Sequence, residues 1–254
     1  MTTWVYTSLL IKSLLFVVLE ITTGLMVRRM NTCRDTRRHM TSAFYESIGS
    51  PKFISAPMVD QSNLAWRLLV RKNAADLAFT QMMHARNFLN DKNYRSDCID
   101  WNDYSHRDGP VESAKSQALD RPLIVQLAGD DPDTLVGAGR IVHKDVAAVD
   151  LNLGCPQKIA KKGNYGAYLL RDIPLTLKCL RSMVAGLDCP VTAKIRRLPG
   201  NDDETVELCQ DIEKCGVQMI TVHGRTVDSN KLWIGPAGKT PFTFPPVSFF
   251  LSLL

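Results

Sequence analysis

The sequence lacks several patterns that would place it quickly in a protein class. Its seven cysteines form no Cys-x-x-Cys pair and have no metal-ligand spacing, which favours reduced thiols in the cytosol or nucleus. No Gly-x-Gly-x-x-Gly turn follows the first predicted strand, so the fingerprint of a dinucleotide-binding, doubly wound sheet is missing. The uncharged runs on either side of Glu20 have seven residues each, too few to span a bilayer.

What remains is ordinary globular material. The chain has 254 residues, enough for one (β/α)₈ barrel or two small domains, and it is 45% hydrophobic and 22% charged. The net charge of +5 allows a nucleic-acid partner without requiring one, because a binding surface also needs its charges to be clustered.

Residues 1–44 form an apolar leader that we expect to be disordered or loosely helical, and unrelated to the rest of the chain. Five arginines follow its apolar part, as in a weak signal-anchor or transit peptide, although Glu20 and Asp35 count against a transit peptide. The leader therefore leaves three interpretations open: a segment foreign to the fold, an organelle-targeting signal, or a membrane-associated helix within residues 1–30. The expected location is cytoplasmic or nuclear, with an organelle or a membrane as the alternative.

From about residue 50, short apolar runs alternate with helical patterns. The apolar spacing around Leu64 and Leu69 predicts a helix with its apolar side chains on one face and Ser62 as its N-cap. The predicted strands are 52–56, 76–79, 121–128, 146–153, 191–195 and 217–222, and the predicted helices are 62–72, 132–143, 174–185 and 201–215.

Repeated strand–helix units predict an α/β fold with a parallel sheet buried on both faces. Polar residues lie at the carboxyl ends of many strands, which favours a TIM (β/α)₈-type barrel over a doubly wound sheet. About six strand–helix units are countable where a closed barrel needs eight, so we expect an incomplete, C-terminally truncated barrel over residues 45–238. Residues 239–254 are expected to be an irregular apolar tail.

Residues 84–120 form a long polar connection between the second and third predicted strands. A connection of this length is usually a functional loop or a flexible insertion, and its few aromatic residues favour the flexible insertion.

The most informative stretch is Asp150–Asp172. A buried strand ends abruptly at Gly154, and Cys155 follows in the loop, beside lysines and a Gly-Asn-Tyr-Gly turn. A thiol at the carboxyl end of a strand, next to positive charge, is positioned for chemistry on an anionic partner.

Five motifs in one order carry a specific resemblance. They are Ser55-Ala-Pro-Met-Val-Asp-Gln-Ser62, Asp150-Leu-Asn-Leu-Gly-Cys-Pro156, Gly163-Asn-Tyr-Gly-Ala167, Thr192-Ala-Lys-Ile-Arg196 and Thr221-Val-His-Gly-Arg-Thr226. Together they resemble the tRNA-dihydrouridine synthases, and most closely the eukaryotic type that acts on positions sixteen and seventeen of the tRNA D-loop. The resemblance covers about residues 45–238.

The resemblance implies a flavoprotein that reduces uridine in the tRNA D-loop to 5,6-dihydrouridine, with FMN as cofactor and NADPH or NADH as reductant. Cys155 would give a proton to C5 of the uracil while hydride reaches C6. The flavin would contact Pro57, Met58, Val59, Gln126, Asn152, Lys194 and His223, and the phosphates of tRNA would contact Lys158, Lys161, Lys162 and Arg171. No metal and no protein partner are implied.

Plainer interpretations stand beside these roles. Lys194 fits an ordinary salt bridge, His223 fits a satisfied core histidine, and the lysines near residue 160 fit a solvated face. Two other functions also stay open: another FMN barrel, related to dihydroorotate dehydrogenase, and a truncated, non-catalytic fragment. The family's glycine-rich motifs for the FMN phosphate do not follow residue 223, so we expect this chain to bind FMN poorly.

Overall fold

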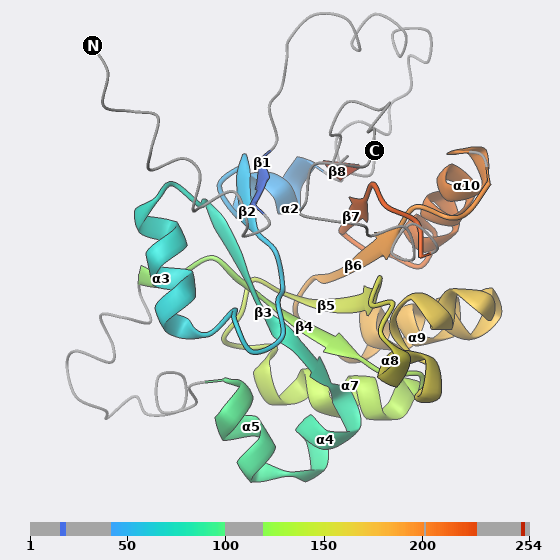
Figure 1. Ribbon diagram of the computed structural model, residues 1–254, viewed down its shortest axis with the longest axis horizontal. Coiled ribbons are helices and arrows are strands. Elements are labelled where there is room, and N and C mark those ends of the chain that lie inside the picture. Colours follow the sequence, from blue (N-terminus) through green and yellow to red (C-terminus); the bar gives the residue numbers. More distant parts are fainter. Residues whose placement is uncertain (1–15, 19–41, 100–118, 201, 228–249, 252–254) are drawn as a thin grey trace, which may run out of the picture.

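The computed structural model describes residues 16–18, 42–99, 119–200, 202–227 and 250–251 (Figure 1). The expected leader and tail lie mostly outside these ranges, as do residues 100–118 and Asn201, the first residue of the last predicted helix. In the described part of the chain no helix is long and apolar enough to cross a membrane.

One sheet organises the molecule, and its strands follow each other in chain order from β1 to β8. The central six strands are parallel, and each pairs with the next along the chain. They are β2 (Phe53–Ser55), β3 (Leu77–His84), β4 (Leu123–Ala128), β5 (Ala148–Leu153), β6 (Val191–Arg196) and β7 (Met219–His223). The short strands β1 (Phe16–Val18) and β8 (Phe250–Leu251) pair antiparallel with β2 and β7 at the two edges.

Sequential order distinguishes the two folds that the sequence left open. A doubly wound sheet reverses its strand order at a switch point, whereas β2 to β7 never do. Since crossovers between parallel strands are right-handed, an unreversed order places the connecting helices on one side of the sheet and curls it. Figure 1 shows the curled sheet with helices around it, which confirms the TIM-type prediction and excludes the doubly wound alternative for these strands.

The helices between strands form the outer layer. They are α3 (Leu64–Lys72), α4 (Ala85–Asn90), α5 (Lys92–Cys98), α7 (Pro132–Val142), α8 (Lys158–Lys162), the 3₁₀ helix η3 (Gly166–Arg171), α9 (Ile173–Gly186) and α10 (Asp202–Glu213). Side chains such as Leu135 of α7 and Met183 of α9 are fully buried against the sheet, and they share one apolar cluster with Val125, Leu151 and Ile195. Side chains alternate along a strand, so the residues directly before and after Val125, Leu151 and Ile195 on their strands point into the curl.

The inner face of the curl changes character from one end to the other. Towards the amino ends of the strands it is apolar, where Ile124 and Met219 pack with Phe44 of the short helix α2 (Ser42–Ser47). Towards the carboxyl ends it carries buried polar side chains, among them Gln126, Asp150 and Thr192. Helix α2 therefore closes one end of the interior, and the polar end is left for a site.

Two local predictions were wrong. The N-cap of α3 is Asn63, whose side chain accepts a hydrogen bond from the backbone N–H of Trp66. The buried face of α3 carries Arg67 and Val70, while Leu69, predicted on the apolar face, is 53% exposed. Arg67 can be buried because its charge is neutralised by Asp120, a carboxylate far away in the sequence.

The long polar connection was also misjudged over residues 85–99. It forms α4 and α5 there, and Phe88 and Ile99 belong to the main apolar cluster. Residue Arg95 helps to order the segment, because its guanidinium donates to the carbonyl oxygens of Phe88 and Leu89.

Candidate active site

A cavity of about 300 Å³ lies at the carboxyl ends of β2, β5, β6 and β7. Parallel strands bring their carboxyl ends to one edge, so residues from distant parts of the sequence meet there. Seven of the eight residues predicted to bind the flavin or donate the proton line this cavity: Pro57, Met58, Val59, Asn152, Cys155, Lys194 and His223. The eighth, Gln126, is fully buried beneath Asn152 and does not line it.

The loop after β2 forms one rim of the cavity. Its shape depends on Ser62, whose hydroxyl accepts a hydrogen bond from the N–H of Met58 at 2.9 Å and donates one to the carbonyl oxygen of Ala56. The N–H of Asp60, a residue with positive φ, donates to the side-chain oxygen of Gln81 on β3. The predicted flavin-contacting residues Pro57, Met58 and Val59 are therefore held in a closed turn.

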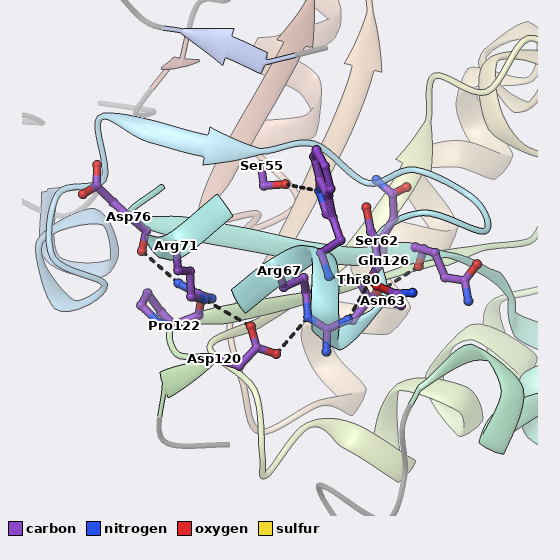
Figure 2. A network of polar contacts seen from close by, with 12 residues as sticks. Ser55, Ser62, Asn63, Arg67, Arg71, Asp76, Thr80, Asp120, Pro122 and Gln126 are labelled. Atoms are coloured by element: carbon purple, nitrogen blue, oxygen red, sulfur yellow. Dashed lines mark hydrogen bonds and ion pairs between the residues drawn. The ribbon is translucent and has the colours of Figure 1, made fainter. Parts of the chain in front are cut away.

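A buried ionic network supports this rim from behind (Figure 2). The guanidinium of Arg67 donates to the carbonyl oxygen of Ser62 at 2.7 Å and to Asp120 at 2.8 Å. The other oxygen of Asp120 accepts a bond from Arg71, which also donates to the carbonyl oxygen of Pro122. The network therefore joins α3 to the start of β4, and Ser62 connects it to the cavity rim.

The loop after β5 presents the thiol. The side-chain oxygen of Asn152 accepts hydrogen bonds from the N–H groups of Gly154 and Cys155, at 3.1 and 2.9 Å. The carbonyl oxygen of Cys155 accepts a bond from the N–H of Ala167 in η3. Gly166, with φ of +64°, packs so closely that a Cβ on it would lie 2.8 Å from the Cβ of Cys155. The cysteine is thus fixed from both sides.

The electrostatic environment keeps this thiol protonated. Burial raises the pKa of Cys155 above its ordinary value of 9.0, and the N–H of Gln157 and the charge of Arg196 oppose the shift less strongly. A thiol that stays protonated at neutral pH is suited to donate a proton rather than to attack as a thiolate.

Lys194 and His223 carry the polar wall opposite the rim. Burial lowers the pKa of Lys194 to about 8, although the nearby Asp150 opposes the shift, and in the described part of the chain Lys194 makes no ion pair. Burial, followed by the charges of Lys194 and Arg196, lowers the pKa of His223 to about 3. His223 is therefore a neutral imidazole beside an ammonium group.

Three further residues of the site escaped the sequence reasoning. Arg196 lines the cavity, and its Nε donates to the carbonyl oxygen of Gly154 at 2.5 Å. Thr221 also lines the cavity, and its buried hydroxyl has no hydrogen-bond partner among the described residues. Asp150 lies below Asn152 and is fully buried. The alternation of side chains along β5, β6 and β7 is the signal that would have indicated all three, because each lies two residues from a predicted site residue.

The predicted RNA-contacting residues lie beside the cysteine loop. Lys158, Lys161 and Lys162 belong to α8 and are exposed. Arg171 at the end of η3 is also exposed, and its guanidinium lies 4.9 Å from the ring centre of Tyr168. All four cations are thus exposed and belong to the segment that follows the cysteine loop, which suits either phosphate contacts or a solvated face.

Comparisons with known proteins match the part of the chain that contains the cavity residues. The family model described as "Dihydrouridine synthase (Dus)" matches residues 54–233. The tRNA-dihydrouridine(16/17) synthase [NAD(P)(+)] of Saccharomyces cerevisiae is 42% identical over 181 residues, which are 71% of this chain and 40% of that protein. Its counterpart in Schizosaccharomyces pombe is 42% identical over 72% of this chain and 42% of its own length.

A mammalian relative gives the same result. The tRNA-dihydrouridine(16/17) synthase [NAD(P)(+)]-like protein of Rattus norvegicus is 42% identical over 191 residues, 75% of this chain and 40% of its own. The chain therefore spans about 40% of the length of these curated relatives.

Proposed function

The chain belongs to the dihydrouridine synthase family, and from this premise we propose that it serves the reduction of uridine to 5,6-dihydrouridine in the D-loop of tRNA. The relatives named for positions 16 and 17 support these as the target. The NAD(P) in their names supports NADPH or NADH as the reductant. A cytoplasmic or nuclear location stays part of the proposal.

One observation carries the proposal. A single cavity contains both a protonated thiol, Cys155, and an ammonium group without an ion pair, Lys194. Reduction of a carbon–carbon double bond in uracil needs a proton donor on one side and a cation that stabilises negative charge on the other. These two groups meet that requirement.

The cavity residues fit FMN as the proposed cofactor. The unpartnered hydroxyl of Thr221 and the unpaired ammonium of Lys194 are polar groups that the described chain leaves unmatched. When bound, FMN would supply the hydride. Lys194 would stabilise the negative charge of the reduced ring, His223 would contact the cofactor as a neutral imidazole, and the rim at Pro57, Met58 and Val59 would provide backbone contacts.

Cys155 acts in this proposal as the acid. Its Sγ holds a proton at neutral pH and would deliver that proton to C5 of the uracil. Arg196 and Asn152 hold the backbone of the loop on either side of Gly154, so the proton is delivered from a fixed position. Gln126 contributes from below, through its bond to Asn152.

The tRNA must expose the base before this chemistry. A uracil inside a folded tRNA is out of reach, so it has to be extruded into the cavity. Lys158, Lys161, Lys162 and Arg171 would then hold the neighbouring phosphates. The cations lie beside the cysteine loop, where the phosphates flanking an extruded base would pass.

The test compares wild-type protein with Cys155→Ala on unmodified tRNA, with FMN and NADPH present. We expect the variant to bind flavin to the same extent as the wild type and to lose most of whatever dihydrouridine formation the wild type shows, measured by mass spectrometry of tRNA digests. Equal dihydrouridine yields would overturn the role of Cys155. Flavin or tRNA binding by the wild type without any product would favour the non-catalytic alternative.

A further inference from the structure

A continuous chain of hydrogen bonds runs under the floor of the cavity. Thr192 donates its hydroxyl to Asp150 at 2.7 Å, and Nε2 of Gln126 donates to the other carboxylate oxygen at 2.8 Å. Nδ2 of Asn152 donates to Oε1 of Gln126, also at 2.8 Å. Asn152 accepts through Oδ1 from the N–H groups of Gly154 and Cys155. The chain therefore connects a buried carboxylate to the backbone of the cysteine.

The chemistry of the groups fixes the direction of every bond in this chain. An ionised carboxylate only accepts hydrogen bonds, so Gln126 must turn its NH₂ group towards Asp150 and its oxygen towards Asn152. Asn152 must then turn its own NH₂ group towards Gln126. Its oxygen is left facing the loop, where the two backbone N–H groups need an acceptor.

Burial makes this arrangement costly to abandon. Asp150, Gln126 and Thr192 are fully buried, and Asn152 is 8% exposed, so water is poorly placed to replace a lost partner. Burial also raises the pKa of Asp150 to about 6, which leaves the carboxylate ionised at neutral pH. A buried charge without an ion pair lowers stability, and such a group is usually retained for a functional reason.

We propose that Asp150 is a positioning residue for Cys155, which orients the amides of Gln126 and Asn152 so that an acceptor faces the N–H groups of Gly154 and Cys155. The positioning itself is independent of any reaction. Its consequence for proton delivery rests on the proposed function.

The test measures hydrogen–deuterium exchange of the Gly154 and Cys155 amides in the purified chain, without flavin or tRNA. Asp150→Ala removes the group that orients Gln126. We expect exchange at these two amides to rise about tenfold relative to the amides of the β5 core, as the loss of a buried bond predicts. Failure of the proposed function would leave this result unchanged, so the two proposals fail separately.

Rescue and coupling separate positioning from general stability. Asp150→Asn keeps an oxygen for Gln126 and gives Thr192 a donor, so exchange should stay within about twofold of wild type. In a Gln126→Met background, Asp150→Ala should add almost nothing, because both changes interrupt the same path. Additive effects of the two changes would overturn the proposal, as would unchanged exchange in Asp150→Ala.

The matched control is Leu151→Ala on the outer face of the same strand. Leu151 is fully buried in the apolar cluster between sheet and helices, so its truncation lowers stability without touching the hydrogen-bond chain. In Leu151→Ala we expect amide exchange to rise uniformly across β5 and the loop that follows it, without a larger rise at Gly154 and Cys155. If Asp150→Ala does not fold, Gln126→Met alone carries the test, and a local rise at Gly154 and Cys155 is again required.

Discussion

Buried charges are treated in opposite ways at the two ends of the sheet. At the amino ends, the fully buried carboxylate of Asp120 receives bonds from two arginines (Figure 2). At the carboxyl ends, Lys194 has no ion pair within the described residues, and burial shifts its pKa. The buried carboxylate at the amino ends is therefore neutralised by partners within the chain, whereas the ammonium group at the carboxyl ends is not.

The difference separates stability from function. A buried polar group that lacks a partner lowers stability, and a fold keeps it only where something else supplies the partner. Thr221, whose hydroxyl has no hydrogen-bond partner, and Lys194, which has no ion pair among the described residues, both line one cavity, whereas the unpartnered Nδ1 of His84 lies outside its lining. The changes proposed below should therefore have opposite effects at the two ends.

The largest effect is expected at the amino ends. Asp120→Ala leaves Arg67, which is 1% exposed, without its carboxylate, so the free energy of unfolding should fall by about 3–5 kcal/mol. Chemical denaturation measures this loss. Asp188→Ala is the control, because that side chain is 85% exposed and its change should stay within about 0.5 kcal/mol. A loss below about 1 kcal/mol for Asp120→Ala would remove the contrast between the two ends.

A smaller effect of opposite sign is expected at the carboxyl ends. Folding lowers the pKa of Lys194 from 10.5 to about 8, so the folded chain disfavours its charge. Lys194→Met should therefore raise the free energy of unfolding at pH 7 by about 1–2 kcal/mol, less than the full shift because Asp150 loses a favourable neighbour.

The pH dependence provides the check. Between pH 8 and 10.5 the unfolded wild type binds more protons at Lys194 than the folded wild type does, so its stability rises with pH in this window. The advantage of Lys194→Met over the wild type should shrink accordingly. A variant that is less stable than wild type at pH 7 would show that Lys194 is matched within the chain.

The smallest effect on stability is expected at the exposed cations. Replacing Lys161 and Lys162 by Gln should change the free energy of unfolding by less than about 0.5 kcal/mol. If both contact phosphates, the slope of log affinity for tRNA against log salt should fall by about one for each lysine. An unchanged slope would identify α8 as a solvated face.

Much of the fold was readable from the sequence. Apolar runs predict all six parallel strands, and the positions of Cys155, Lys194 and His223 at or after the carboxyl ends of these strands predict that they meet at one edge of the sheet. These inferences depend on local patterns, the period of a strand and the position where it ends.

The errors concern partners that lie far apart in the sequence. Arg67 is buried because Asp120, 53 residues away, neutralises it, and no local pattern contains that information. The hydrogen bond between Gln126 and Asn152 could not be predicted for the same reason, since the two residues are 26 residues apart. Each was given a separate role towards the flavin, and the bond between them is visible only when β4 and β5 lie side by side.

The close contact between Gly166 and Cys155 also limits how this region can change. A Cβ at position 166 would lie 2.8 Å from both the Cβ and the carbonyl oxygen of Cys155, and the φ of +64° already disfavours other residues. In a library that samples every amino acid at every position, position 166 should therefore accept glycine alone. The restriction comes from the Cβ and backbone of residue 155 rather than from its thiol, so it should persist in Cys155→Ala.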